Sequence, residues 1–177
     1  MKHFAIPCLL AAAATLTLAG CDKPKDRTPP PAAGAAAPAA APAAKVATGP
    51  LPALPAWSQA MLGKGLTTLF PAEMKPCVGN TDTVEQRYAD GVKIIGWGWD
   101  PATKAPIARV VLVDGTGMVA GAGETGVARP DVTAAKPEIT DPATGWAAYT
   151  SRTSGPVEGY GILDGGKSLC RLGHLEF

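Results

Sequence analysis

Short apolar segments alternate with turn residues from Thr83 to the end of the chain, and this alternation constrains the fold more than any other feature. The segments are rich in Val, Ile and aromatic residues, and turn signals such as DGTG and DGGK separate them. They cover residues 83–90, 92–100, 107–114, 117–124, 145–152, 158–165 and 167–177. The pattern predicts an all-β fold, an antiparallel Ig-like or jelly-roll-like sandwich of about seven strands.

Two further stretches of the folded part lack a strand pattern. Residues 128–145 predict a long loop with at most one helical turn. Before the first strand, five apolar residues follow an approximately helical spacing that glycines interrupt, which leaves a short helix or an irregular packing arm as alternatives. These five residues are Trp57, Met61, Leu62, Leu66 and Leu69.

A Pro- and Ala-rich stretch covers residues 21–56 and contains nine of the eighteen prolines. Phe4 is the only aromatic residue before Trp57. Such a stretch buries too little apolar surface to fold, and its prolines interrupt any helix. The sequence therefore predicts a disordered tether over 21–56 and a folded domain over 57–177.

The N-terminus has the pattern of an export signal, with Lys2 followed by an apolar run that is too short for a spanning helix. The letters LAGC, ending at Cys21, resemble the lipobox of bacterial lipoproteins. The resemblance implies a signal peptide over 1–20, lipid on the Cys21 sulfur and anchoring at the extracytoplasmic or periplasmic face of the cell membrane. Asp22 resembles a signal for retention in the inner membrane. An ordinary secretory peptide that happens to contain a cysteine is the alternative.

Export leaves two cysteines for the folded domain, because Cys8 leaves with the signal peptide and Cys21 carries lipid. Cys77 and Cys170 then meet an oxidising compartment and are predicted to form one disulfide. Free thiols or a metal site are the alternatives. No further Cys or His lies at ligand spacing, so no metal is expected.

A second resemblance covers about residues 78–172, through GWGWD, VDG, RPDV and the later GWAAYTSR. These letters resemble a small extracytoplasmic β-sandwich that forms the C-terminal domain of certain bacterial membrane proteins, many of them glycosyltransferase-like. The resemblance implies a sandwich outside the cytoplasmic membrane. It implies no catalytic residues.

Aromatic residues are the first candidates for a binding site. Trp97 and Trp99 share one face of a strand. We expect Trp97 in the core between the sheets and Trp99 partly exposed near the strand end, where Trp146 and Tyr160 could join it to stack on a sugar. Core packing of these rings is the favoured interpretation, and stacking on a sugar is the alternative.

The RPDV motif supplies the other candidates. Pro130 suits the start of a turn, and Arg129 and Asp131 are expected either to form a structural latch through an ion pair or to contact a ligand.

Cofactor and catalytic motifs are weak. GAGETG at 121–126 matches a dinucleotide-binding pattern, but no helical run follows it, so no cofactor is expected. His174 is the only histidine outside the signal peptide, and neither G-x-S-x-G nor H-E-x-x-H occurs. Removing Lys2 with the signal leaves fifteen basic and fifteen acidic residues, a balance that gives no indication of a nucleic-acid partner.

Together these observations predict a lipid-anchored cell-envelope protein that presents a non-enzymatic interaction module. Its expected partner is envelope polysaccharide or a membrane protein. A carbohydrate-binding domain using exposed Trp or Tyr is one alternative. An envelope hydrolase with an unrecognised carboxylate site is another.

Overall fold

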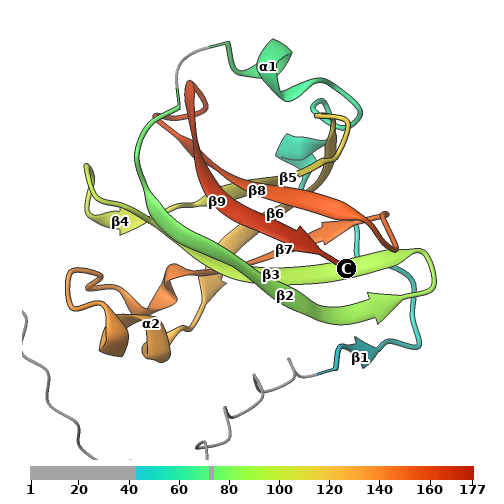
Figure 1. Ribbon diagram of the computed structural model, residues 1–177, viewed down its shortest axis with the longest axis horizontal. Helices are drawn as coiled ribbons and strands as arrows, with labels where there is room; N and C mark the ends of the chain where they lie inside the picture. Colours follow the sequence, from blue (N-terminus) through green and yellow to red (C-terminus); the bar gives the residue numbers. More distant parts are fainter. Residues whose placement is uncertain (1–42, 72–73) are drawn as a thin grey trace, which may run out of the picture. The chain divides into compact units, whose positions relative to one another are not determined.

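The computed structural model describes residues 43–71 and 74–177 (Figure 1). The expected signal peptide, Cys21 and the tether as far as residue 42 lie outside the described residues. The described part is mostly β, and its strands form one open, mixed sheet of nine strands in the order β1-β2-β3-β7-β6-β5-β8-β9, with β4 paired to β3. All neighbouring strands are antiparallel except β1 and β2.

Seven of the nine strands are long, and each overlaps one of the segments predicted from the sequence. The all-β, sandwich-like prediction is therefore confirmed. The strands are β1 (Lys45–Val46), β2 (Val78–Tyr88), β3 (Gly91–Asp100), β4 (Ala105–Pro106), β5 (Arg109–Asp114), β6 (Val119–Val127), β7 (Gly145–Thr150), β8 (Pro156–Leu163) and β9 (Ser168–Glu176).

The sheet folds over so that β9 crosses β2 near the two ends of the strand order (Figure 1). The Thr81 hydroxyl on β2 donates to the Gly173 carbonyl on β9 at 3.1 Å. A disulfide joins Cys77 to Cys170, with Cα atoms 5.8 Å apart, as predicted. These contacts hold together strands that the sheet does not pair.

The interior of the folded sheet is built around Trp146, which is fully buried. Ile94, Leu112 and Leu172 belong to the same cluster. Gly96 makes room for the indole, because a Cβ at Gly96 would lie 2.3 Å from a Trp146 ring carbon. The glycines of GWGWD therefore point inward and its tryptophans outward, as the pleat requires.

Trp97 and Trp99 lie on the outer face of the sheet, in a cluster with Val132 and Ile139 that we call the sealed patch. The chain that covers it contains α2 (Pro130–Ala135) and the 3-10 helix η2 (Pro142–Thr144), so the predicted loop has two short helical elements where a single turn was expected. Trp97 is buried as expected, at 9% exposure. Its expected place between the sheets is wrong, because Trp146 fills the interior from the neighbouring strand.

An N-terminal arm, residues 51–71, covers a second outer patch formed by Val111, Val113 and Val119. The arm contains the 3-10 helix η1 (Ala56–Ser58) and the four-residue α1 (Leu66–Leu69) and is otherwise irregular, so both predicted alternatives are present in part. All five apolar residues predicted to pack there do so.

The ordered chain also extends further towards the N-terminus than the expected tether boundary at residue 56. Strand β1 pairs with β2, and the Leu51 amide donates to Asp90 at 3.0 Å. Backbone pairing of this kind depends little on side chains, so a Pro- and Ala-rich composition did not reveal it.

Candidate functional site

A groove of about 570 Å³ lies between the N-terminal arm, the β5–β6 hairpin and the loop after β7. We call it the hairpin groove. Its lining includes Leu51, Leu54, Leu62, Met118, Asp114 and Arg152.

Asp114 organises the hairpin at one side of the groove. Its Oδ1 accepts from the Thr116 amide at 2.9 Å, the Thr116 hydroxyl at 2.5 Å and the Met118 amide at 3.2 Å. Gly117 supplies the positive φ of 83° that the turn needs. The DGTG hairpin predicted from the sequence is therefore confirmed, and its geometry leaves Oδ2 of Asp114 for a partner outside the turn.

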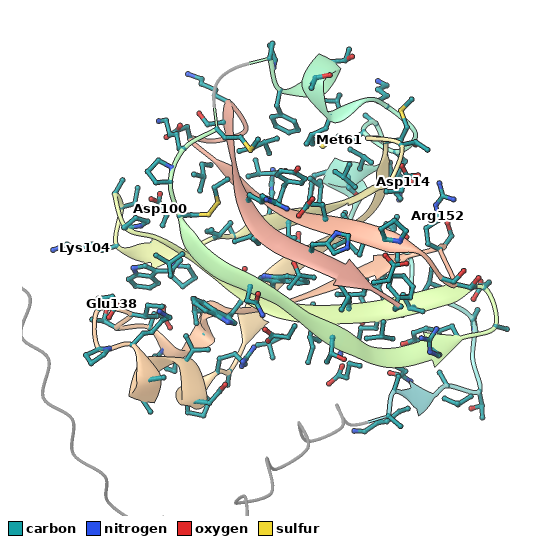
Figure 2. All side chains as sticks on the ribbon, viewed as in Figure 1. Met61, Asp100, Lys104, Asp114, Glu138 and Arg152 are labelled. Carbon is teal, nitrogen blue, oxygen red and sulfur yellow. A yellow bond between two sulfur atoms is a disulfide. The ribbon has the colours of Figure 1, made fainter. Side chains whose placement is uncertain are left out.

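That partner is Arg152, which follows β7 and forms an ion pair with Oδ2 of Asp114 (Figure 2). Burial by itself would raise the pKa of Asp114, but the hydrogen bonds from Thr116, Met118 and Arg152 hold that pKa below its ordinary value. The carboxylate is 7% exposed and the Arg152 side chain 52%. The groove therefore has a fixed, ionised acid in its wall and an exposed guanidinium at its surface.

Apart from Thr116 and Ser151, the rest of the groove wall is apolar. Leu51, Leu54 and Leu62 come from the N-terminal arm, and Val119 comes from the start of β6. Met118 is 42% exposed, one of four large apolar side chains exposed in the described part, together with Val46, Met74 and Val127. An exposed thioether beside aliphatic side chains offers an adaptable apolar contact surface.

A second, smaller hollow of about 280 Å³ lies against the same hairpin. Tyr160, Glu158 and His174 contribute side chains to it, and we call it the Tyr160 hollow. Burial and the nearby Glu158 carboxylate raise the pKa of Tyr160. The tyrosine is therefore a neutral hydroxyl at physiological pH.

Arg129 and Asp131 form an ion-pair latch over the sealed patch. The Arg129 Nε and Nη2 atoms donate to the two Asp131 oxygens at 2.9 and 2.8 Å, and Nη1 donates to Asp82 on β2 at 2.5 Å. The hydrogen bond from Arg129 is the main cause that holds the pKa of Asp131 below its ordinary value. The structure thus has the geometry of the predicted latch, which joins the α2 segment to β2.

The tryptophans considered for a stacking surface are buried, as the favoured core-packing interpretation predicts. Trp99 is 2% exposed and Trp146 is 0% exposed, so the expectation that Trp99 is partly exposed is wrong. The physical reason is the cover: Val132 and Ile139 pack over Trp99, and a single sequence does not show which loop folds onto which strand. Of the predicted ring residues, Tyr160 lines a hollow.

Sequence reasoning missed Arg152, Met118 and the leucines of the arm as a shared surface. The DGTG turn was the one local signal that pointed to Asp114. Arg152 lies 38 residues beyond Asp114, and no local pattern joins the two.

Within 43–71 and 74–177, no group of three or more His, Cys, Asp or Glu residues is arranged to hold a metal ion. No helix in these same ranges has the length and apolar character needed to cross a membrane. Comparisons with protein-family models, curated proteins and solved structures find no match to this chain.

Proposed function

We propose that the chain is a lipid-anchored protein of the cell envelope whose β domain is a non-enzymatic binding module. Its partner is a membrane protein that docks in the hairpin groove. The observation that carries this proposal is that an exposed Met118 and an Arg152 held by its ion pair with Asp114 line the same groove. Methionine and arginine are both enriched at protein–protein interfaces.

The chemistry of the wall favours a protein over a polysaccharide as the occupant of this groove. Polysaccharides are held by stacking on aromatic rings, whereas the residues that line the groove in the described domain include no aromatic side chain. Aliphatic side chains of a protein partner would cover Leu54, Leu62 and Met118. A carboxylate of the partner would reach the exposed guanidinium of Arg152, since Asp114 contacts only one of its nitrogen atoms.

A binding role also fits the state of Asp114. Both of its oxygens already accept hydrogen bonds, and its lowered pKa makes it a weak base. The carboxylate in the groove is therefore committed to holding the hairpin and Arg152 in place.

The proposed location rests on the N-terminal letters and on the disulfide. The lipobox-like LAGC provides the lipid-carrying Cys21, and Asp22 favours the inner membrane. Cys77 and Cys170 are bonded, which suits an oxidising compartment outside the cytoplasm. We place the domain at the extracytoplasmic face, held by acyl chains on Cys21.

The anchor is tested by mass spectrometry of the protein extracted from its native membrane. The expected N-terminal peptide begins at Cys21 and carries diacylglyceryl. Cys21→Ala is expected to release the protein from washed membranes. An unmodified N-terminus, or cleavage at another residue, would contradict the anchor.

The groove is tested with a photo-crosslinking amino acid at Met118 in the full-length, membrane-anchored chain. The control carries the same amino acid at Val127, which is 38% exposed at the end of β6, next to the sealed patch. We expect a discrete membrane-protein adduct from position 118 that Arg152→Gln removes, and no such adduct from position 127. Identical adducts from both positions, or an adduct that survives Arg152→Gln, would refute the groove as the interface.

A further inference from the structure

We infer that the Tyr160 hollow is a separate binding site for a neutral saccharide with neighbouring hydroxyl groups. This inference rests on the proposal that the domain is a binding module. It concerns a different pocket from the hairpin groove, with only Asp114 in the lining of both, and a different class of ligand.

Strand pairing brings four polar side chains together at this site. Glu158 and Tyr160 are alternate residues of β8, so both lie on one face of the sheet. On β9, His174 pairs with Glu158 and Arg171 pairs with Tyr160. The hollow thus has a carboxylate, a phenol, an imidazole and a guanidinium in or beside it.

Some of this hydrogen-bonding capacity is unused. The Arg171 contacts at 2.7 and 2.6 Å both go to Oε1 of Glu158, and Oε2 has no partner among the described residues. The Tyr160 hydroxyl likewise forms no hydrogen bond to any residue in 43–71 or 74–177, although its side chain packs against the Val111 cluster. An acceptor and a hydroxyl are therefore positioned beside the hollow without protein partners.

The charge of the site favours a neutral ligand. Arg171 is paired with Glu158, so neither charge is available alone to an ion. Asp114, which also lines the hollow, is paired with Arg152. An anion would be repelled by two carboxylates, and a cation would compete with two arginines that already hold them.

The form of the site fits a sugar. Oε2 of Glu158 can accept a hydrogen bond from one sugar hydroxyl, and the Tyr160 hydroxyl can donate to or accept from a neighbouring one. Tyr160 adds a ring with a polar end. The volume of about 280 Å³ lies just below the usual range of pockets for drug-sized ligands, and so suits one sugar ring of a longer chain.

The test uses the full-length mature chain in a detergent without a sugar head group. Maltotriose, cellotriose and chitotriose are titrated at millimolar concentration, with trigalacturonate and inorganic phosphate as anionic probes. Binding is followed by the amide NMR signals of Gly115, Gly117 and His174, which line the hollow. We expect at least one neutral trisaccharide to shift these signals and the two anions to leave them unchanged.

Two pairs of variants locate the site. Glu158→Gln should weaken binding at least about tenfold, because it removes a charged acceptor, and Tyr160→Phe should weaken it several-fold. The matched controls are Glu85→Gln, which breaks the similar pair with Lys93 on another face, and Tyr149→Phe on β7. Both controls should bind as the parent chain does.

The inference is overturned if no neutral trisaccharide shifts the three signals, if an anion binds there more tightly, or if the Glu158 and Tyr160 variants match their controls. Leu54→Ser separates this result from the proposed function, because Leu54 lines the hairpin groove but not the hollow. It should weaken the crosslink at Met118 and leave saccharide binding intact. Loss of one property alone therefore identifies which proposal has failed.

Discussion

Two outer patches of the same sheet are covered by irregular chain, yet one is sealed and the other is hollow. Over the sealed patch, the α2 segment packs on two indole rings, and the Arg129 latch fastens it to β2. Over the second patch, the N-terminal arm packs leucines on valines and leaves the hairpin groove. Trp57, the only indole of the arm, lies half-buried, with its Nε1 donating to Glu124 at 2.8 Å and Arg109 over its ring.

Both patches are covered, so the presence of a covering segment does not decide where a pocket exists. What decides it is whether side chains fill the space between the segment and the sheet. Large rings under a short segment fill the space between cover and sheet completely. Branched aliphatic side chains on a segment interrupted by Gly63 and Gly65 do not. The arginines beside the two patches differ in the same way. Arg129 is 20% exposed and bonded to two carboxylates, whereas Arg152 is 52% exposed and bonded to one.

The largest expected effect applies to both patches at once. Replacing Cys77 and Cys170 by Ser removes a link across 93 residues, and should lower the free energy of unfolding by about 4–5 kcal/mol through the entropy of the unfolded chain. Denaturant unfolding followed by Trp fluorescence and by far-UV dichroism measures it. Both probes should shift together; separate transitions would mean that the two patches are not parts of one cooperative unit.

Trp99→Ala tests the sealed patch directly. The ring is 2% exposed and packed against the α2 segment, so its loss should destabilise the domain by about 3–5 kcal/mol. Trp57→Ala, on the half-buried ring of the arm, should have a smaller effect in the same unfolding measurement. If the two variants are equally destabilised, the contrast between a filled and an unfilled patch is wrong.

Arg129→Ala should lower the free energy of unfolding by about 1–2 kcal/mol, because it leaves Asp82 and Asp131 without their shared donor. Hydrogen exchange should increase first in α2, at the amides of Val132 and Lys136. Unchanged protection there would show that the aromatic contacts alone hold the segment.

Acid should affect the two regions unequally. The folded-state pKa of Asp114 lies below its unfolded value, with burial opposed and outweighed by hydrogen bonds, so its stabilisation is present above about pH 5 and is lost as the pH falls through the folded pKa. The pKa of Asp131 is lowered by Arg129 in the same sense, but that carboxylate is 64% exposed and solvent screens it.

Unfolding from pH 7 to pH 2 of the parent, Asp114→Asn and Asp131→Asn chains measures the difference. The difference in free energy of unfolding between the parent and Asp114→Asn should close below about pH 4. At pH 7 it should be larger than the difference between the parent and Asp131→Asn. A larger difference for Asp131→Asn would contradict the expectation that the buried carboxylate, Asp114, contributes more to stability.

The smallest expected effect on stability belongs to the groove. Arg152→Gln should change the free energy of unfolding by at most about 1 kcal/mol, since its side chain is mostly in water, and Met118→Ser should do no more. Arg152→Gln should nevertheless remove the crosslink from position 118. A destabilisation as large as that of Arg129→Ala would indicate that Arg152 is a second structural latch.

Much of the fold was predictable because its signals are local. The alternation of branched and aromatic residues with Gly- and Asp-rich turns placed the seven long strands, and DGTG gave a hairpin whose Asp114 bonds amides two and four residues away. The site was less predictable. Its groove depends on the arm meeting the hairpin, and its ion pair joins residues 38 positions apart.

The GWGWD stretch shows most clearly what the sequence determined and what the tertiary structure decided. The sequence by itself determined that its glycines and tryptophans take opposite faces, since successive residues of a strand must alternate. Only the tertiary structure decided which face was the interior, because that depends on Trp146 of β7 filling the space above Gly96 and on the α2 segment closing over Trp99. Alternation follows from the geometry of the strand backbone, whereas packing depends on which distant residues the fold places against each face.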